Sequence, residues 1–150
     1  MCADACMHAP HGIVLQYADR QSLQHVIHEG VEAGSKFSEP NARNFAWQFV
    51  RGMRHLHSLN IIHRDIKPHN LFIDSNLQGE SELLKIGDFG LAKTLKTSNP
   101  RELDAYFFIG TVPFAAPEML ARKPRYDIKK AELWAVGATL CAQSSLPLLK

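Results

Sequence analysis

Hydrophobic residues recur every three or four positions between about residues 39 and 58, the spacing that places side chains on one face of a helix. Four large apolar residues follow this spacing: Phe45, Phe49, Met53 and Leu56. Ser38 can cap the first turn, and Glu39 and Pro40 suit that turn because an acidic side chain and a proline are both favoured there. The pattern predicts an amphipathic helix with one buried face.

Shorter hydrophobic runs predict the remaining elements. A run at residues 128–142 is apolar around most of its circumference and predicts a helix that is largely buried. Two runs, at residues 71–73 and 83–86, flank a polar, turn-rich stretch and predict two brief strands. A β-prone run at residues 13–17 predicts another strand. Residues 87–117 show neither the hydrophobic period of a helix nor the alternation of a strand, so we expect a long functional loop there.

Composition limits the class of protein without naming an activity. The 150 residues carry 17 basic and 15 acidic side chains, and a net charge of +2 gives no reason to expect a nucleic-acid partner or a membrane-surface partner. No apolar stretch is long enough to span a bilayer. Three cysteines are an odd and sparse set that cannot form a disulfide framework, so we expect a reducing, cytoplasmic setting.

The first twelve residues have no hydrophobic period, and we expect residues 1–12 to be unstructured. They include residue types that bind zinc: Cys2, Cys6, His8 and His11. Their spacing differs from that of a standard zinc finger, and the segment has little core of its own. Binding of zinc or nucleic acid through this cluster and the basic stretches of the chain is one functional alternative.

A dense polar segment follows the expected amphipathic helix. The sequence HRDIKPHN at residues 63–70 brings a carboxylate, an ammonium group and an amide together, and DFG follows at residues 88–90. Carboxylate and amide oxygens on short loops are ligands that Mg²⁺ accepts, and a nearby lysine can neutralise a phosphate oxygen. These residue types suit phosphoryl transfer.

The same segments, followed by APE at residues 116–118, occur in the order and approximate spacing of the catalytic loop and activation segment of protein kinases. Residues 13–142 therefore resemble a eukaryotic-type serine/threonine protein kinase catalytic domain, with weaker similarity to the autophagy-initiating kinase group. The resemblance implies a mainly α fold with short β-hairpins, in which the large lobe and the hinge strand are present and the small lobe is largely absent. The tail at residues 143–150 diverges from the family pattern.

The resemblance implies transfer of the γ-phosphoryl group of ATP to a serine or threonine hydroxyl of a protein substrate, with Mg²⁺. Asp65 matches the aspartate that accepts the proton of the substrate hydroxyl, and Lys67 matches the lysine that contacts the γ-phosphate. Asn70 and Asp88 match the Mg²⁺ ligands. The serine/threonine class follows from the position of Lys67 and from Gly110–Val112 ahead of APE.

By the same resemblance, the nucleotide would lie against the hinge. Leu15 matches the gatekeeper, and backbone groups near Gln16 and Ala18 would meet the adenine edge. Ser22 could reach the ribose and begins the helix that follows the hinge. Phe72 would lie under the adenine ring, where the family usually has an aliphatic residue.

The resemblance also suggests regulatory positions. Arg64 matches the arginine that receives a phosphate from the activation segment. The hydroxyl groups within that segment belong to Thr94, Thr97, Ser98 and Thr111. We interpret Thr111 primarily as the structural threonine that contacts the catalytic aspartate and lysine. His63 is expected to pack against Phe89 in the core and not to act as an acid or base.

Three further features of the sequence depart from the family pattern. A glycine-rich phosphate loop and an Ala-x-Lys strand do not occur in the 150 residues. Glu132 stands where the family has an aspartate that braces the catalytic loop, and its additional methylene predicts weaker bracing. These departures keep a second hypothesis open, in which the chain is a non-catalytic kinase-like module that binds a substrate or partner.

Overall fold

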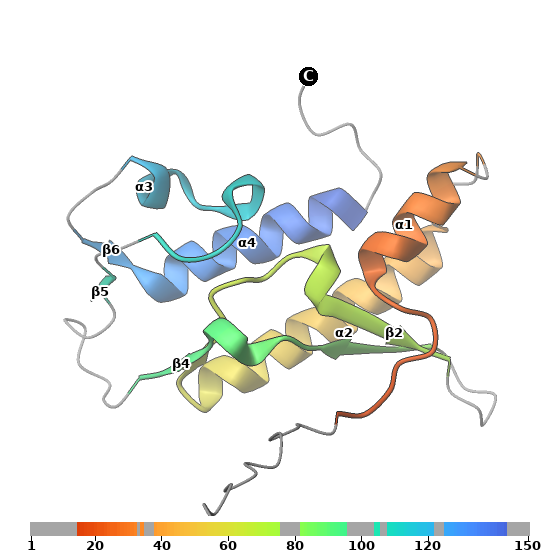
Figure 1. Ribbon diagram of the computed structural model, residues 1–150, viewed down its shortest axis with the longest axis horizontal. Helices are drawn as coiled ribbons and strands as arrows, with labels where there is room; N and C mark the ends of the chain where they lie inside the picture. The colour runs from red at the N-terminus through yellow and green to blue at the C-terminus, as the bar shows by residue number, and fades with distance from the viewer. Residues whose placement is uncertain are drawn as a thin grey trace, which may run out of the picture.

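The computed structural model describes residues 15–32, 34, 38–75, 82–95, 104–105, 108–121 and 125–143. Two long helices dominate this part of the chain, and the segments that connect them carry short strands and turns (Figure 1). The helices are α1 (Leu23–Glu32), α2 (Glu39–Ser58), α3 (Pro117–Leu120) and α4 (Ile128–Gln143). The strands are β1 (Ile61–Ile62), β2 (Leu71–Asp74), β3 (Leu83–Ile86), β4 (Lys93–Thr94), β5 (Asp104–Ala105) and β6 (Tyr126–Asp127). Three 3₁₀ turns are η1 (Pro68–Asn70), η2 (Phe89–Leu91) and η4 (Val112–Phe114).

Helix α2 forms over the range that the hydrophobic period predicts. The hydroxyl oxygen of Ser38 accepts a hydrogen bond from the backbone N–H of Asn41 at 3.4 Å, and Pro40 lies in the first turn. Phe45 and Phe49 are each 1% exposed. The main core cluster joins this face to α1, the catalytic loop, β2 and α4 through Leu23, Phe45, Phe49, Met53, Ile66, Leu71, Ile73 and Val136. Burial of this one face is the main stabilising contact of the helix.

The described strands form three antiparallel pairs of two strands each: β1 with β4, β2 with β3, and β5 with β6. In the longest pair Leu71 lies opposite Ile86 and Asp74 lies opposite Leu83. Gln48 of α2 ties this hairpin to the helix: its amide nitrogen donates to the carbonyl of Glu82 at 2.9 Å, and its amide oxygen accepts from the N–H of Leu84 at 2.8 Å. The mainly helical fold with short β-hairpins is thus confirmed.

Three predictions about local structure are wrong or incomplete. Residues 15–17 form no strand, and Leu15 is 78% exposed, because no other described strand lies beside them to complete a ladder. Helix α4 is not buried on all sides, since Leu133 and Trp134 are 57% and 51% exposed. The range 87–117 is not wholly irregular and contains η2, β4, β5 and η4.

Several expectations fall on residues outside the described ranges. These are the predicted disorder of residues 1–12, the Cys/His cluster within them, residues 13–14 of the predicted strand, and the tail from residue 144. Among the described helices, none combines the length and apolar character that a membrane crossing needs.

Candidate functional site

The polar segment at residues 63–70 forms a loop between β1 and β2, and Figure 1 shows it lying between the two long helices. Two residues that border the site have left-handed backbone conformations: Arg64 with φ 69° and Asp88 with φ 60°. Such conformations are uncommon for residues other than glycine and cost free energy, so the surrounding contacts must hold them in place. The backbone N–H of Gly87 donates to the carbonyl of Asn70 at 2.9 Å and links the two segments.

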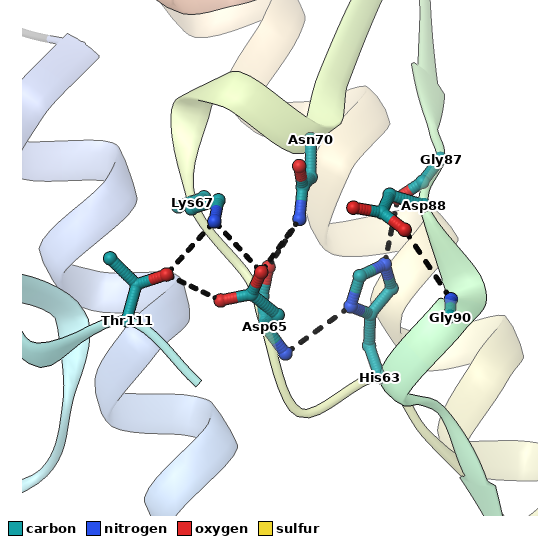
Figure 2. Close-up of polar contacts among 8 residues, drawn as sticks. All are labelled: His63, Asp65, Lys67, Asn70, Gly87, Asp88, Gly90 and Thr111. Carbon is teal, nitrogen blue, oxygen red and sulfur yellow. Dashed lines mark hydrogen bonds and ion pairs between the residues drawn. The ribbon is translucent and has the colours of Figure 1, made fainter. Parts of the chain in front are cut away.

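The carboxylate of Asp65 lies at the centre of a network of side chains (Figure 2). The hydroxyl of Thr111 donates to Oδ1 at 2.6 Å, and the ammonium of Lys67 lies 2.8 Å from Oδ2. Lys67 also donates to the Thr111 hydroxyl at 2.9 Å, which closes a triangle of three side chains. The amide nitrogen of Asn70 donates to the Asp65 carbonyl at 2.9 Å and to Oδ2 at 3.2 Å. The predicted contact of Thr111 with the aspartate and the lysine is confirmed.

These contacts determine the charge state of Asp65. Burial alone would raise the pKa of this carboxyl, since it is only 8% exposed. Hydrogen bonds from Lys67 and Thr111, the charge of Lys67 and the hydrogen bond from Asn70 outweigh burial and hold the pKa below its ordinary value. Asp65 is therefore an anion at neutral pH, with its two oxygens in fixed positions.

Asn70 and Asp88 present oxygen atoms to the same region. In the view of Figure 2, Asn70 lies between Asp65 and Asp88. The amide nitrogen of Asn70 donates to Asp65, which leaves its side-chain oxygen as the atom able to act as a metal ligand. The exposed carboxylate of Asp88 accepts one long hydrogen bond, from the N–H of Gly90 at 3.4 Å. Hard oxygen donors of these types fit Mg²⁺, which commonly uses one or two protein ligands and completes its shell with water and phosphate oxygens.

His63 is a structural element of this site. It is fully buried, and its ring centroid lies 4.9 Å from that of Phe89, so the predicted packing is confirmed. Nε2 lies 2.9 Å from the Gly87 carbonyl oxygen, which can only accept, so Nε2 carries the proton. Nδ1 then accepts the N–H of Asp65 at 3.4 Å. Both nitrogens are occupied by backbone groups, and neither faces a substrate.

Glu132 of α4 binds the backbone of the loop at residues 63–70. Its side chain is 2% exposed, and Oε1 accepts the N–H of Arg64 at 2.8 Å. The other oxygen lies 2.6 Å from Nε2 of His57, near the end of α2. The extra methylene of glutamate is thus compatible with a direct bond to the loop. Sequence reasoning missed His57, because 75 positions separate it from Glu132 and no local pattern links the two.

The structure places only some of the residues expected to contact the nucleotide close to one another. Ser22 forms an isolated antiparallel bridge with Phe72, which places the start of α1 beside β2. The Ser22 hydroxyl accepts from the N–H of His25 at 3.3 Å and therefore caps α1. Leu15 is too exposed to form the buried wall of a pocket, and Gln16 lies in the same exposed, irregular stretch, followed by the half-buried Ala18.

Phe72, which the resemblance expects under the adenine ring, packs beside the glycine that precedes Asp88. A Cβ built on Gly87 would come within 2.7 Å of the Phe72 ring, so that ring packs directly on the backbone just before Asp88. Only a glycine at position 87 leaves room for this close approach.

The structure describes three of the five residues that the resemblance suggests as regulatory. The guanidinium Nε of Arg64 donates to the carbonyl of Leu91 at 2.5 Å, so this side chain holds η2 against the catalytic loop. Thr94 lies exposed in β4, opposite Ile61. Thr97 and Ser98 lie outside the described residues. Thr111 contributes its hydroxyl to the Asp65 network.

Comparison with known proteins agrees with this geometry. The family model described as protein kinase domain matches residues 4–145. CBL-interacting protein kinase 26 of Oryza sativa subsp. japonica is 39% identical over 127 residues, covering 85% of this chain and 23% of the relative. Serine/threonine-protein kinase SAPK2 of the same organism is 39% identical over 129 residues, covering 85% of this chain and 34% of the relative.

A third relative carries a different description. Inactive serine/threonine-protein kinase PLK5 of Mus musculus is 35% identical over 128 residues, covering 85% of this chain and 19% of the relative. The chain therefore spans between about a fifth and a third of the length of these curated relatives.

Proposed function

The chain belongs to the protein kinase domain family, and from that premise we propose that it carries the phosphoryl-transfer centre of a serine/threonine protein kinase. Proteins of this family generally use ATP and Mg²⁺. The observation that carries the proposal is the Asp65 carboxylate, held as an anion by three side chains from separate positions in the sequence. The reaction would transfer the γ-phosphoryl group of ATP to a serine or threonine hydroxyl of a protein.

In the proposed mechanism Asp65 receives the substrate. Its carboxylate accepts the hydrogen bond of the attacking hydroxyl and orients the oxygen toward the γ-phosphorus. It takes the proton as the new P–O bond forms and the bond from the γ-phosphorus to the bridging oxygen breaks, with ADP as the leaving group. Thr111 fixes the carboxylate in position through Oδ1, because its hydroxyl donates there at 2.6 Å. Lys67, already beside Asp65, supplies a positive charge to the oxygens of the phosphoryl group in transit.

Asn70 and Asp88 would hold the metal ion. The side-chain oxygen of Asn70 and the exposed carboxylate of Asp88 are the donors on the two linked segments. Mg²⁺ bound there would neutralise the charge of the phosphates. The backbone near Gln16 and Ala18 would meet the adenine edge, with Ser22 near the ribose and Phe72 under the ring.

We extend the proposal to regulation through Arg64. Its guanidinium lies at η2, beside the start of the activation segment, and uses a backbone carbonyl as acceptor. A phosphate on Thr94, Thr97 or Ser98 would compete with that carbonyl, because a doubly charged acceptor binds a guanidinium more strongly.

A second candidate is a kinase-like module that binds a partner and transfers nothing. The observation in its favour is the bulky Phe72 ring, which packs on Gly87 where the resemblance expects an aliphatic residue under the adenine. One relative is itself described as an inactive kinase. In that case Asp65 and Lys67 would serve only to order the loop.

Incubation with labelled ATP, Mg²⁺ and a generic basic protein distinguishes the two candidates. We expect phosphate incorporation that falls ~100-fold or more in Asp65→Asn and Asp88→Asn. Glu29→Gln on the exposed surface of α1 removes one negative charge far from the loop and should leave incorporation unchanged. Absence of incorporation, together with no Mg·ATP-dependent rise in melting temperature, would rule out phosphoryl transfer by this chain.

A further inference from the structure

The outer face of α2 exposes an unusual combination of side chains. Trp47 is 62% exposed and Val50 is 44% exposed, although both are large apolar residues. Three arginines, Arg43, Arg51 and Arg54, are exposed on the same helix. With about 100° of rotation per residue, these five positions fall within one face, opposite the buried Phe45, Phe49 and Met53. We call these five residues the arginine–tryptophan face.

Trp47 is held in place on this surface. The guanidinium carbon of Arg51 lies 5.8 Å from the centroid of the indole ring, a cation–π contact. On the other side of the ring, a hollow open to solvent is lined by Glu39, Pro40, Arg43, Asn44 and Trp47. The indole therefore forms one wall of a hollow that an apolar side chain of a partner could enter.

The charges of the face are mostly uncompensated. Glu39 is the only acidic residue of α2, and it pairs with Arg43 at 3.0 Å. Within the described part of the chain, Arg51 and Arg54 have no carboxylate partner. Two guanidinium groups without a carboxylate partner in the described ranges, beside an exposed indole and an exposed valine, would complement carboxylates that flank an apolar side chain.

We propose that the arginine–tryptophan face binds an acidic peptide segment of another protein, with one apolar side chain of that segment seated against Trp47 and Val50. From Arg43 to Arg54 the face is about 17 Å long, which matches about five residues of extended peptide. An acidic peptide fits better than a nucleic acid, because two guanidinium groups without a described carboxylate partner are few for a phosphate backbone, whereas the exposed Trp47 and Val50 suit an apolar side chain. This function goes beyond phosphoryl transfer and does not depend on it, since the face lies on the side of α2 away from the buried core.

A binding experiment with the full chain tests the proposal. The probe is a fluorescein-labelled ten-residue peptide with one central leucine among aspartates and glutamates, followed by fluorescence anisotropy. We expect Trp47→Ala and Arg54→Glu each to weaken its affinity about tenfold. Lys93→Glu on β4 is the matched control, because Lys93 is also exposed and the substitution changes the net charge equally. It should bind the peptide as the parent chain does.

Peptide variants and a competitor complete the test. Replacing the carboxylates of the peptide by amides, or its leucine by serine, should each weaken binding about tenfold. The proposal would be overturned if the parent chain failed to bind the acidic peptide at millimolar concentration, or if Lys93→Glu weakened binding as much as Arg54→Glu. It would equally be overturned if single-stranded RNA of the same charge bound more tightly than the peptide.

Discussion

Replacement of Glu132 by alanine should destabilise the fold through the catalytic loop. The substitution removes the acceptor of the Arg64 N–H, which is bonded at 2.8 Å, and leaves that amide without a partner. It also removes the hydrogen-bond partner of His57, which lies at 2.6 Å, and leaves a cavity where the glutamate side chain, 2% exposed, was packed. An unsatisfied amide, a lost charged hydrogen bond and a lost methylene together cost about 3 kcal/mol.

Glu132→Gln removes the charge of this side chain and keeps its length, so it separates the two contributions to stability. Glutamine has the same length, and its amide oxygen can still accept the Arg64 N–H, so we expect a loss of about 1 kcal/mol. Glu29→Ala on the exposed surface of α1 is the control and should change stability by less than about 0.5 kcal/mol. Free energies of unfolding would come from urea titrations followed by circular dichroism.

The double variant His57→Ala with Glu132→Ala tests whether the two residues act as a pair. If the carboxylate holds both the loop and the histidine, the double variant should lose less stability than the two single variants predict by addition. The reasoning would be refuted if Glu132→Ala stayed within about 0.5 kcal/mol of the parent, or if glutamine at this position were as destabilising as alanine.

Two further predictions concern the same network. Gly110→Ala should lower the free energy of unfolding by about 2 kcal/mol or more in urea titrations. Gly110 has φ 122°, and an added Cβ would lie 2.6 Å from the Arg64 carbonyl oxygen. Gly137→Ala in α4 is the control, because its added Cβ meets no neighbour and should be neutral or stabilising. Because the folded-state pKa of Asp65 is depressed, its contribution to stability is present above the unfolded pKa and is lost as the pH falls through the folded value. The stability difference between the parent and Asp65→Asn should therefore shrink below about pH 4, and a difference that stayed constant from pH 6 to pH 2 would contradict this linkage.

The elements that the sequence predicts well are those with a long hydrophobic period. Helix α2 has four apolar residues at helical spacing and a capping serine, and its bounds agree with the prediction. Helix α1 carries fewer large apolar residues, and only its start at Leu23 was predicted. Strands β1, β4, β5 and β6 have two residues each, too few to show a period of two, and only tertiary contacts define them.

The contacts of the candidate site also fall into those that the sequence predicts and those that it does not. Asp65, Lys67 and Asn70 lie within six positions, so their neighbourhood follows from the sequence. The contact of Thr111 came from the family resemblance, because 46 positions separate it from Asp65. The pairing of His57 with Glu132 and the packing of Phe72 on Gly87 depend on how α4 and β3 dock, and no local pattern encodes either. The exposure of Leu133 and Trp134 likewise depends on which elements pack against α4, and the local sequence does not encode this.

The Gln48 side chain has a consequence for self-association. A strand at the margin of a sheet exposes unpaired N–H and C=O groups that can recruit a strand from another molecule. In β3 the N–H of Leu84 and the neighbouring carbonyl of Glu82 are both taken by the Gln48 amide, which acts as a one-residue substitute for an adjacent strand. The edge of β3 is thereby closed to intermolecular pairing at this point, because the Gln48 side chain occupies the groups that a second strand would need.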